Sequence, residues 1–247
     1  MTKKVKNPLA QFGFSMVSPR EKRSKVDQVF SSVHKKYDLM NDLMSIGLHR
    51  KWKQFAVDLC RLKNKDFVLD IASGTGDIAR SVAKVVGNSN VIVSDVNYDM
   101  LSLGRKKLED GGVNVAGVQC DSENIPFPSE TFDCVTVAFG VRNMTNKEEA
   151  LREIHRVLKW GGKVVVIEFS KIWAPLEPIY DNYSFRFIPA LGEFMARDRS
   201  SYKYLAESIK MHPSQQEFKK LMGKAGFEIV DYFNLSFGIV AVHRGFK

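Results

Sequence analysis

The sequence has few cysteines and no long apolar run, and both features limit the classes of protein to which it can belong. Cys60, Cys120 and Cys134 form no CxxC pair and are too few for a disulfide framework, which favours a reducing, cytoplasmic compartment. We expect each of them to be a small buried apolar residue. The longest apolar stretches, such as 164–167, are far shorter than the roughly 18–20 residues that span a bilayer, so we expect no transmembrane helix. The basic start at 1–6 is not followed by an apolar segment and a cleavage site, so we expect no secretory signal.

The composition is otherwise that of an ordinary globular protein. The 247 residues are 44% hydrophobic and 26% charged, which suffices for a sizeable core in one or two domains. The net charge of +9 is unevenly distributed, because residues 1–65 hold 15 Lys and Arg against 5 Asp and Glu, whereas residues 66–247 are almost balanced. A basic N-terminal quarter suits an anionic membrane surface or nucleic acid, or else forms a solvated helical face.

Hydrophobic periodicity divides the chain into a helical start and an α/β core. We interpret residues 1–20 as a leader without regular structure. Apolar residues at three- and four-residue steps predict one amphipathic helix over 25–44 and a second, short helix around 52–59. Runs rich in β-branched residues, mostly separated by helix-length segments, predict strands at 67–73, 90–96, 113–120, 132–139 and 163–169. This alternation predicts a mainly parallel α/β sheet.

The last third of the chain interrupts the alternation. The segment 171–213, with several prolines and many aromatic residues, predicts a helical insertion. A helix near 214–225 and two strand-like runs at 228–235 and 238–242 follow it. The short connection between these runs indicates an antiparallel hairpin at one edge of the sheet.

The segment 68–79 (VLDIASGTGDIA) is the first motif with a chemical meaning. A buried strand runs into a glycine turn and a helix, where open α/β sheets bind nucleotides. Gly74 and Gly76 let the backbone approach a ligand. The motif G-x-G-x-x-G/A, however, is compatible with both a dinucleotide-dependent oxidoreductase and a methyltransferase. Asp70 and Asp77 flank the glycines and would repel a pyrophosphate, whereas the ammonium and sulfonium groups of S-adenosylmethionine favour acidic neighbours. The pattern therefore favours a methyltransferase.

Acidic and polar residues also follow the next two strands. Asp95 ends a strand about twenty residues after the turn, where a carboxylate binds the ribose hydroxyls of either cofactor or, alternatively, caps the next helix. Asp121 and Ser122 follow the third strand at the same carboxyl edge. A side chain there can reach the adenine amino group.

Several blocks resemble one known family. They include 37–52 (YDLMNDLMSIGLHRKW), 139–143 (FGVRN), 168–171 (EFSK), 204–213 (YLAESIKMHP) and 242–246 (VHRGF). From about residue 12 to the end, the chain resembles the ubiquinone/menaquinone biosynthesis C-methyltransferases. The resemblance implies a class I methyltransferase-like Rossmann fold with a mostly parallel seven-stranded sheet, an antiparallel edge hairpin, N-terminal helices and a helical insertion. It also implies transfer of a methyl group from S-adenosylmethionine to a ring carbon of a demethylmenaquinol, a 2-methoxy-6-polyprenyl-1,4-benzoquinol, or both.

The resemblance implies cofactor contacts along the carboxyl edge of the sheet. Together with the glycine turn, these give a predicted cofactor site of Asp70, Gly74, Thr75, Gly76, Asp95, Asp121, Ser122 and Ala138.

The reaction narrows the catalytic roles. Displacement at a sulfonium needs no metal, but it needs a nucleophilic ring carbon held in line. Ionising a ring hydroxyl, with a pKa near about 10, activates that carbon, so a base or a cation must act on the oxygen. We predict that Arg142, beside Asn143, holds the quinolate oxygen or organises the water that removes its proton; a structural ion pair is the alternative. Tyr37 belongs to a polar group within 37–49 that contacts the ring or caps the cofactor site.

We interpret the chain as a single methyltransferase domain. Its parts are an N-terminal helical cap (1–60), a cofactor-binding core (61–170), a helical substrate-side insertion (171–213) and a C-terminal helix with the edge hairpin (214–247).

The expected partners follow from the substrate. A polyprenyl tail stays in a membrane because each buried methylene contributes about 0.8 kcal/mol. We therefore expect a cytoplasmic protein, peripheral at a bacterial inner membrane. Its partners would be the polyprenyl quinol, an anionic membrane surface and a quinone-biosynthesis protein complex. Two alternatives stay open, an NAD-dependent oxidoreductase and a basic nucleic-acid-binding module, although no zinc spacing or aromatic basic platform supports the latter and we expect no nucleic-acid partner.

Overall fold

One seven-stranded sheet organises the part of the chain that the structure describes. The computed structural model describes residues 9–247, without the side chains of Lys35, Met195 and Ala196. The strand order is β5-β4-β3-β6-β7-β9-β8. The bounds are β3 (Val68–Ile71), β4 (Val91–Asp95), β5 (Ala116–Gln119), β6 (Phe132–Ala138), β7 (Leu158–Phe169), β8 (Glu228–Leu235) and β9 (Val240–Phe246). The strands from β5 to β7 are parallel, and β9 is antiparallel to both β7 and β8, which confirms the predicted sheet and its edge hairpin.

Helices cover both faces of this sheet. The apolar sides of α3 (Leu48–Leu59), α4 (Asp77–Val86) and α5 (Tyr98–Asp110) share one buried cluster with one face of the strands. On the other face, α6 (Lys147–Val157) and α10 (Gln215–Lys224) contribute to a second cluster. The central strand β3 is buried along its whole length, as expected of a parallel strand covered on both sides. This packing fixes the positions of the loops at the carboxyl edge.

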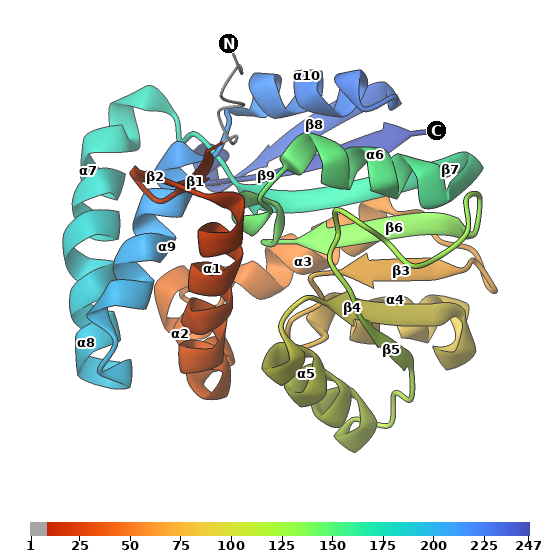
Figure 1. The fold of residues 1–247 in the computed structure, drawn as a ribbon, viewed down its shortest axis with the longest axis horizontal. Coiled ribbons are helices and arrows are strands. Elements are labelled where there is room, and N and C mark those ends of the chain that lie inside the picture. Colours follow the sequence, from red (N-terminus) through yellow and green to blue (C-terminus); the bar gives the residue numbers. More distant parts are fainter. Residues whose placement is uncertain (1–8) are drawn as a thin grey trace, which may run out of the picture.

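The remaining α-helices of the described residues lie beyond that edge, toward which the arrowheads of β3 and β6 point in Figure 1. They are α1 (Pro19–Val33), α2 (Tyr37–Ser45), α7 (Glu177–Asn182), α8 (Ile188–Ala196) and α9 (Arg199–Met211). A π-helical turn at Tyr183–Phe187 joins α7 to α8. The segment 171–213 is thus largely helical, as predicted, while its assignment to the substrate side stays a prediction. Within residues 9–247, no helix combines the length and the apolar character needed to cross a membrane.

The start of the chain is more ordered than predicted. Residues 1–8 lie outside the described residues, but part of 9–20 forms a small antiparallel hairpin of β1 (Ala10–Phe12) and β2 (Ser15–Val17). The side chain of Ser18 accepts a hydrogen bond from the N–H of Glu21 at 3.2 Å, and a proline occupies the first turn of α1. Both features are ordinary signals for the start of a helix. They place the first residue of α1 at Pro19, whereas the apolar periodicity placed the start of the helix at residue 25.

The single helix predicted over 25–44 is also wrong. α1 ends at Val33, α2 begins at Tyr37, and a 3₁₀ turn joins them. At the break, the ring Nδ1 of His34 lies 2.6 Å from the backbone oxygen of Ser31. The contact ties the His34 ring to the last turn of α1, and the apolar periodicity carried no sign of the break.

Candidate active site

A cavity of about 440 Å³, here called the first cavity, lies at the carboxyl ends of the parallel strands. Five of the predicted cofactor residues line it: Gly74, Asp95, Asp121, Ser122 and Ala138. They come from the ends of four different strands, so the sheet brings together side chains that are far apart in the sequence. This edge is where ligands bind in open α/β sheets.

Asp95 is the buried carboxylate of the first cavity. It is 9% exposed, and its two oxygens accept hydrogen bonds from the N–H groups of Gly74 and Asn97, each at 3.0 Å. Burial raises the pKa of this carboxyl. The cap of α5 is Asn97, which accepts from the N–H of Met100 at 2.9 Å, so the alternative of Asp95 as a helix cap is wrong. The amide of Asn97 also holds α1 by donating to Asp27 at 2.6 Å.

α1 closes one side of the first cavity, which the sequence did not reveal. Arg23 lies 2.9 Å from a carboxylate oxygen of Glu123 and 3.2 Å from one of Asp121. Lys22 is almost fully buried and donates a hydrogen bond to the backbone oxygen of Met144 at 2.7 Å. Burial lowers the pKa of Lys22 to about 7. In the sequence Lys22 and Arg23 lie between the predicted leader (1–20) and the predicted helix (25–44), and nothing there indicates a cavity wall.

Three predicted cofactor residues do not line the first cavity. Asp70 is buried within β3 and accepts a hydrogen bond from the hydroxyl of Thr136 at 2.7 Å. Thr75 points toward α2, where its hydroxyl donates to Asp38 at 2.8 Å. Gly76 starts α4 with φ +81°, and a Cβ there would meet Leu108 at 2.7 Å. These residues shape the loop beneath the cavity rather than its surface, because successive positions of the strand and turn point in different directions.

The charge argument from the glycine turn also needs correction. Burial raises the pKa of Asp70 to about 7, so this carboxyl is a weak source of negative charge. Asp77 forms an ion pair with Lys53 at 2.6 Å, which keeps its pKa below the usual value although burial acts in the opposite direction. The carboxylates that face the first cavity are instead Asp27, Asp95, Asp121 and Glu123.

A substitution at Gly76 tests whether the glycine turn requires a residue without a side chain. We expect Gly76→Ala to lower the free energy of unfolding by about 1–3 kcal/mol, because the added Cβ clashes with Leu108 and the backbone is left-handed. Chemical denaturation measures this loss. The matched control is Gly223→Ala in α10, where no atom lies within 4 Å of the added Cβ, and we expect it to be neutral or slightly stabilising. Equal stability of the two variants would show that the turn tolerates a side chain.

A second cavity of about 280 Å³ adjoins the first and is mainly apolar. Aromatic and aliphatic side chains from α1, α2, α3, the insertion and β7 line it, among them Val33, Met40, Trp52, Phe169, Tyr180, Tyr183, Ile188 and Tyr202. Four residues line both cavities: Phe30, Tyr37, Phe139 and Asn143. A ligand in one cavity therefore lies next to a ligand in the other.

Arg142 lines the second cavity and is held by a buried ion pair. Its Nη1 lies 2.8 Å from Glu168 and also donates to the backbone oxygen of Phe139. The backbone N–H of Arg142 donates to the other oxygen of Glu168 at 3.1 Å. The Nε atom is buried without a partner among the residues that the structure describes. The sequence left a structural ion pair as the alternative role; the pair is present, and it holds the guanidinium at the cavity wall.

The two other predicted catalytic residues lie where the cavities meet. Asn143 follows Arg142 in a 3₁₀ turn, and its side-chain oxygen accepts a hydrogen bond from the hydroxyl of Tyr204 at 3.0 Å. Tyr37 begins α2 and lines both cavities. The structure thus brings Tyr37, Arg142 and Asn143 together around the second cavity, although their catalytic roles stay predictions.

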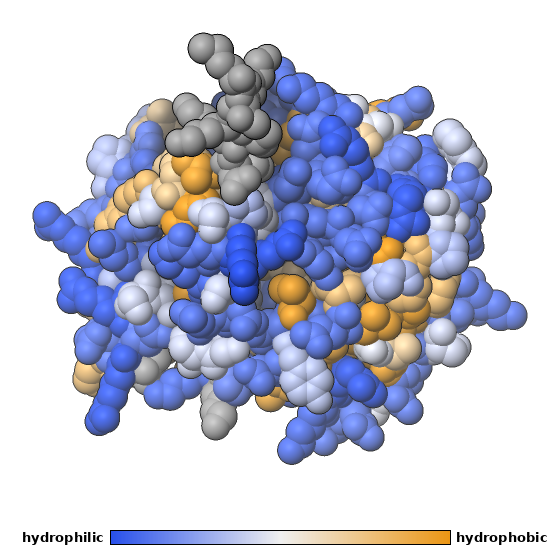
Figure 2. All heavy atoms as spheres, in the orientation of Figure 1, coloured by the Kyte–Doolittle hydropathy of each residue, from blue (hydrophilic) through white to orange (hydrophobic). Residues whose placement is uncertain are grey.

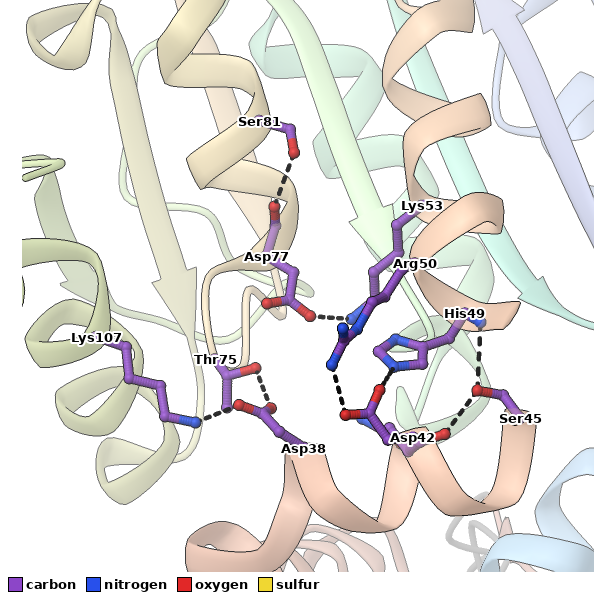
Figure 3. A network of polar contacts seen from close by, with 11 residues as sticks. Asp38, Asp42, Ser45, His49, Arg50, Lys53, Thr75, Asp77, Ser81 and Lys107 are labelled. Atoms are coloured by element: carbon purple, nitrogen blue, oxygen red, sulfur yellow. Dashed lines mark hydrogen bonds and ion pairs between the residues drawn. The ribbon is translucent and has the colours of Figure 1, made fainter. Parts of the chain in front are cut away.

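Polar contacts tie the N-terminal helices to the glycine loop (Figure 3). Asp38 of α2 accepts from Thr75 of the loop and forms an ion pair with Lys107 of α5. Lys53 of α3 pairs with Asp77 at the start of α4. The wall of the second cavity is therefore fastened to the loop that borders the first.

A histidine and a carboxylate form a pair at the edge of this network. His49 is 6% exposed and lines the second cavity, and its Nε2 lies 2.7 Å from Asp42. The hydrogen bond from His49 and the charge of Arg50 lower the pKa of Asp42. The Nδ1 atom of His49 is buried and has no partner within the described part of the chain. With Nε2 donating to Asp42, Nδ1 is left as the proton-accepting nitrogen.

Solved structures with the same fold show the structural class of this protein. Solved structures with a similar fold include S-adenosylmethionine-dependent methyltransferases from Thermotoga maritima and Aquifex aeolicus. The first has a TM-score of 0.62 and 22% identity, covering 90% of this chain and 99% of that one. The second has a TM-score of 0.59 and 19% identity, covering 78% and 88%. The fold is that of the class I methyltransferases.

The sequence narrows this class to one family. The model of the ubiE/COQ5 methyltransferase family matches residues 17–247, and the chain belongs to this family. It is 54% identical over 237 residues to the ubiquinone/menaquinone biosynthesis C-methyltransferase UbiE of Nitrosospira multiformis, covering 96% of this chain and 97% of that protein. It is 51% identical over 240 residues to the protein of the same name from Cronobacter sakazakii, covering 96% of each.

The family settles the open alternatives. The chain is an S-adenosylmethionine-dependent methyltransferase, as its motif blocks predicted, and its cofactor is S-adenosylmethionine. Neither the oxidoreductase nor the nucleic-acid-binding alternative is supported.

Proposed function

We propose that this protein transfers a methyl group to a ring carbon of a polyprenylated quinol, either a demethylmenaquinol, a 2-methoxy-6-polyprenyl-1,4-benzoquinol, or both. The names of its relatives support this substrate class. The observation that carries the proposal is the common wall of the two cavities, formed by Phe30, Tyr37, Phe139 and Asn143. A cavity lined by several carboxylates beside a mainly apolar one suits a reaction between a positively charged cofactor and an apolar substrate.

The residues of the first cavity fit the cofactor. S-adenosylmethionine, when bound, provides an electrophilic methyl group on a sulfonium. Asp95 would accept hydrogen bonds from the ribose hydroxyls, while Asp121 and Ser122, which line the same cavity, would contact the adenine. The volume of about 440 Å³ falls within the usual range for small-molecule sites. The acidic lining favours a ligand that carries positive charge.

The second cavity would hold the quinol ring and the first isoprene units. Tyr180, Tyr183 and Tyr202 of the insertion present large apolar surfaces to it. Tyr37 and Asn143, at the common wall, would orient the ring toward the first cavity. Enclosing the ring in this way excludes water from the reacting carbon.

Two groups in the second cavity can act on the ring hydroxyl. Arg142 would stabilise the oxygen as it becomes negative, with Glu168 fixing the direction of the guanidinium. His49, whose ring is hydrogen-bonded to Asp42, would be the base that accepts the proton of the ring hydroxyl. Ionisation of the hydroxyl pushes electron density onto the adjacent ring carbon, which would then take the methyl group from the bound cofactor. The bond between sulfur and methyl would break, S-adenosylhomocysteine would leave, and the proton on that ring carbon would be lost to restore the aromatic ring.

The site of action follows from the substrate. Because a polyprenyl tail stays in the bilayer, the protein would meet its substrate as a cytoplasmic protein, peripheral at a bacterial inner membrane. The basic charge of residues 1–65 would attract anionic lipid, and a quinone-biosynthesis protein complex would be a further partner.

The experiment that tests the function combines cells and purified protein. In cells that lack this protein, quinone profiling should show the unmethylated precursor accumulating, and its identity names the substrate. The purified protein should then methylate a short-tailed analogue of that precursor. Normal quinone profiles together with no transfer to benzoquinol or naphthoquinol analogues would overturn the proposal.

A further inference from the structure

The turn between α2 and α3 carries an unusual residue. α2 ends at Ser45, and the next residue, Ile46, has φ 50° and ψ 40°, in the left-handed region. Glycine or asparagine is the usual residue at this position after a helix, because a β-branched side chain is strained there. Ile46 is also 89% exposed. Neither the backbone nor the core of the protein therefore accounts for an isoleucine at this position.

Other exposed apolar side chains surround Ile46. Leu39 and Leu43 precede it at helical spacing on the same side of α2, and Leu48 begins α3. We call Leu39, Leu43, Ile46 and Leu48 the apolar lip. On the face shown in Figure 2, hydrophilic residues surround separate groups of hydrophobic residues.

The apolar lip is continuous with the second cavity. Ile46 and Leu48 belong both to the lip and to the lining of that cavity. An apolar surface thus extends from the outside of the molecule to the wall next to Tyr37 and Arg142. A chain of isoprene units could follow it from the surface of the protein into the cavity.

Basic residues stand beside the lip. Arg50, which is paired with Asp42 at 2.6 Å but whose side chain is 71% exposed, and the exposed Lys51 follow it on the first turn of α3. They belong to the N-terminal quarter with 15 Lys and Arg against 5 Asp and Glu. Apolar side chains flanked by cations match the chemistry of an anionic bilayer, whose headgroups attract the cations while its interior accepts the apolar groups.

We propose that the apolar lip inserts into an anionic bilayer surface and that the polyprenyl tail enters the second cavity along it. The inference rests on the proposed function for the nature of the tail, but the docking itself does not require methyl transfer. It also explains Ile46, because the strain of its backbone is offset when the side chain leaves water for lipid.

The test uses Ile46→Asn, since asparagine tolerates the left-handed backbone and removes the apolar side chain. The probe is vesicles of phosphatidylcholine with phosphatidylglycerol, and vesicles of phosphatidylcholine alone. We expect the parent protein to sediment with the mixed vesicles and Ile46→Asn to bind them about tenfold more weakly. The KM for a long-tailed quinol in vesicles should rise in parallel, while affinity for S-adenosylmethionine stays unchanged.

The chain offers a matched control in Ile229→Asn. Ile229 also has a left-handed backbone, with φ 46°, and is 73% exposed, but it lies on the edge strand β8 and lines neither cavity. Its replacement should leave vesicle binding and methyl transfer unchanged.

Three results would overturn the docking proposal. They are a parent protein that does not bind mixed vesicles, equal binding by Ile46→Asn, and an equal loss with Ile229→Asn. Self-association through the lip, seen as an oligomer that Ile46→Asn dissociates in the absence of lipid, would also overturn it by assigning the lip to a second copy of the chain. If the vesicle results are as expected but no quinol is methylated, the proposed substrate fails and the docking surface stands.

Discussion

Replacement of Asp95 by alanine is expected to lower the affinity for S-adenosylmethionine at least about a hundredfold and to leave the fold intact. Asp95 is the buried carboxylate at the end of β4 that faces the first cavity. Two charge-assisted hydrogen bonds to the ribose, each of about 1.5–3 kcal/mol, would be lost. Isothermal titration calorimetry measures the affinity, and circular dichroism checks the fold. Undiminished affinity would remove Asp95 from the cofactor site.

The control is Asp95→Asn, which keeps the shape of the side chain. In the structure Asp95 also accepts the N–H of Gly74, so alanine could loosen the glycine loop as well as remove a ligand. If the negative charge matters for the cofactor, asparagine should lose most of the affinity. Its melting temperature should fall less than that of Asp95→Ala, because one side-chain oxygen still accepts one of the two backbone N–H groups, those of Gly74 and Asn97. In the parent, burial raises the pKa of Asp95, so affinity should fall as the pH is lowered into the acidic range and the carboxyl takes up a proton.

The strands and their carboxyl edge could be predicted from the sequence. Runs of β-branched residues gave the parallel strands, and the topology of a parallel sheet places the ends of β4, β5 and β6 together. Asp95, Asp121 and Ala138 accordingly lie in one cavity. The prediction succeeded here because it needed only the strand ends, which periodicity locates within a few residues.

Within the glycine turn, the sequence did not reveal which positions face the first cavity, and the cofactor contacts of Thr75 and Gly76 stay predictions. Gly74 lines the first cavity, whereas Thr75 and Gly76, its immediate neighbours, do not. The direction of each side chain depends on contacts with distant residues, such as Thr75 with Asp38 of α2 and Gly76 with Leu108 of α5. No local pattern carries that information.

The tertiary roles of charged residues were the hardest to predict. Lys22 lies in a charged segment to which the apolar periodicity assigned no element, yet it is almost fully buried against the backbone of Met144. Glu168 was part of a motif block but had no assigned role, and it proves to be the ion-pair partner of Arg142. Buried charges depend on a partner supplied by another element, so a single sequence does not reveal them.

Arg142→Lys is expected to lower the rate of methyl transfer about a hundredfold while affinity for S-adenosylmethionine stays nearly unchanged. Lysine keeps the charge beside Glu168, but a point ammonium cannot reproduce the planar guanidinium that also binds the backbone oxygen of Phe139. A loss of this size is typical for one group that stabilises an oxyanion. The measurement is single-turnover methyl transfer to a short-tailed quinol at several pH values.

The pH dependence separates a catalytic role of Arg142 from a purely structural one. If Arg142 stabilises the quinolate, the difference between parent and variant should narrow as the pH approaches about 10, because the ring hydroxyl then ionises without help. A structural defect would lower the rate equally at every pH. Activity within about threefold of the parent throughout would remove Arg142 from the mechanism. Proton removal would then fall to His49, and His49→Gln, with Asp42→Asn as its companion, should show the large loss instead, since both variants take away the carboxylate-held imidazole.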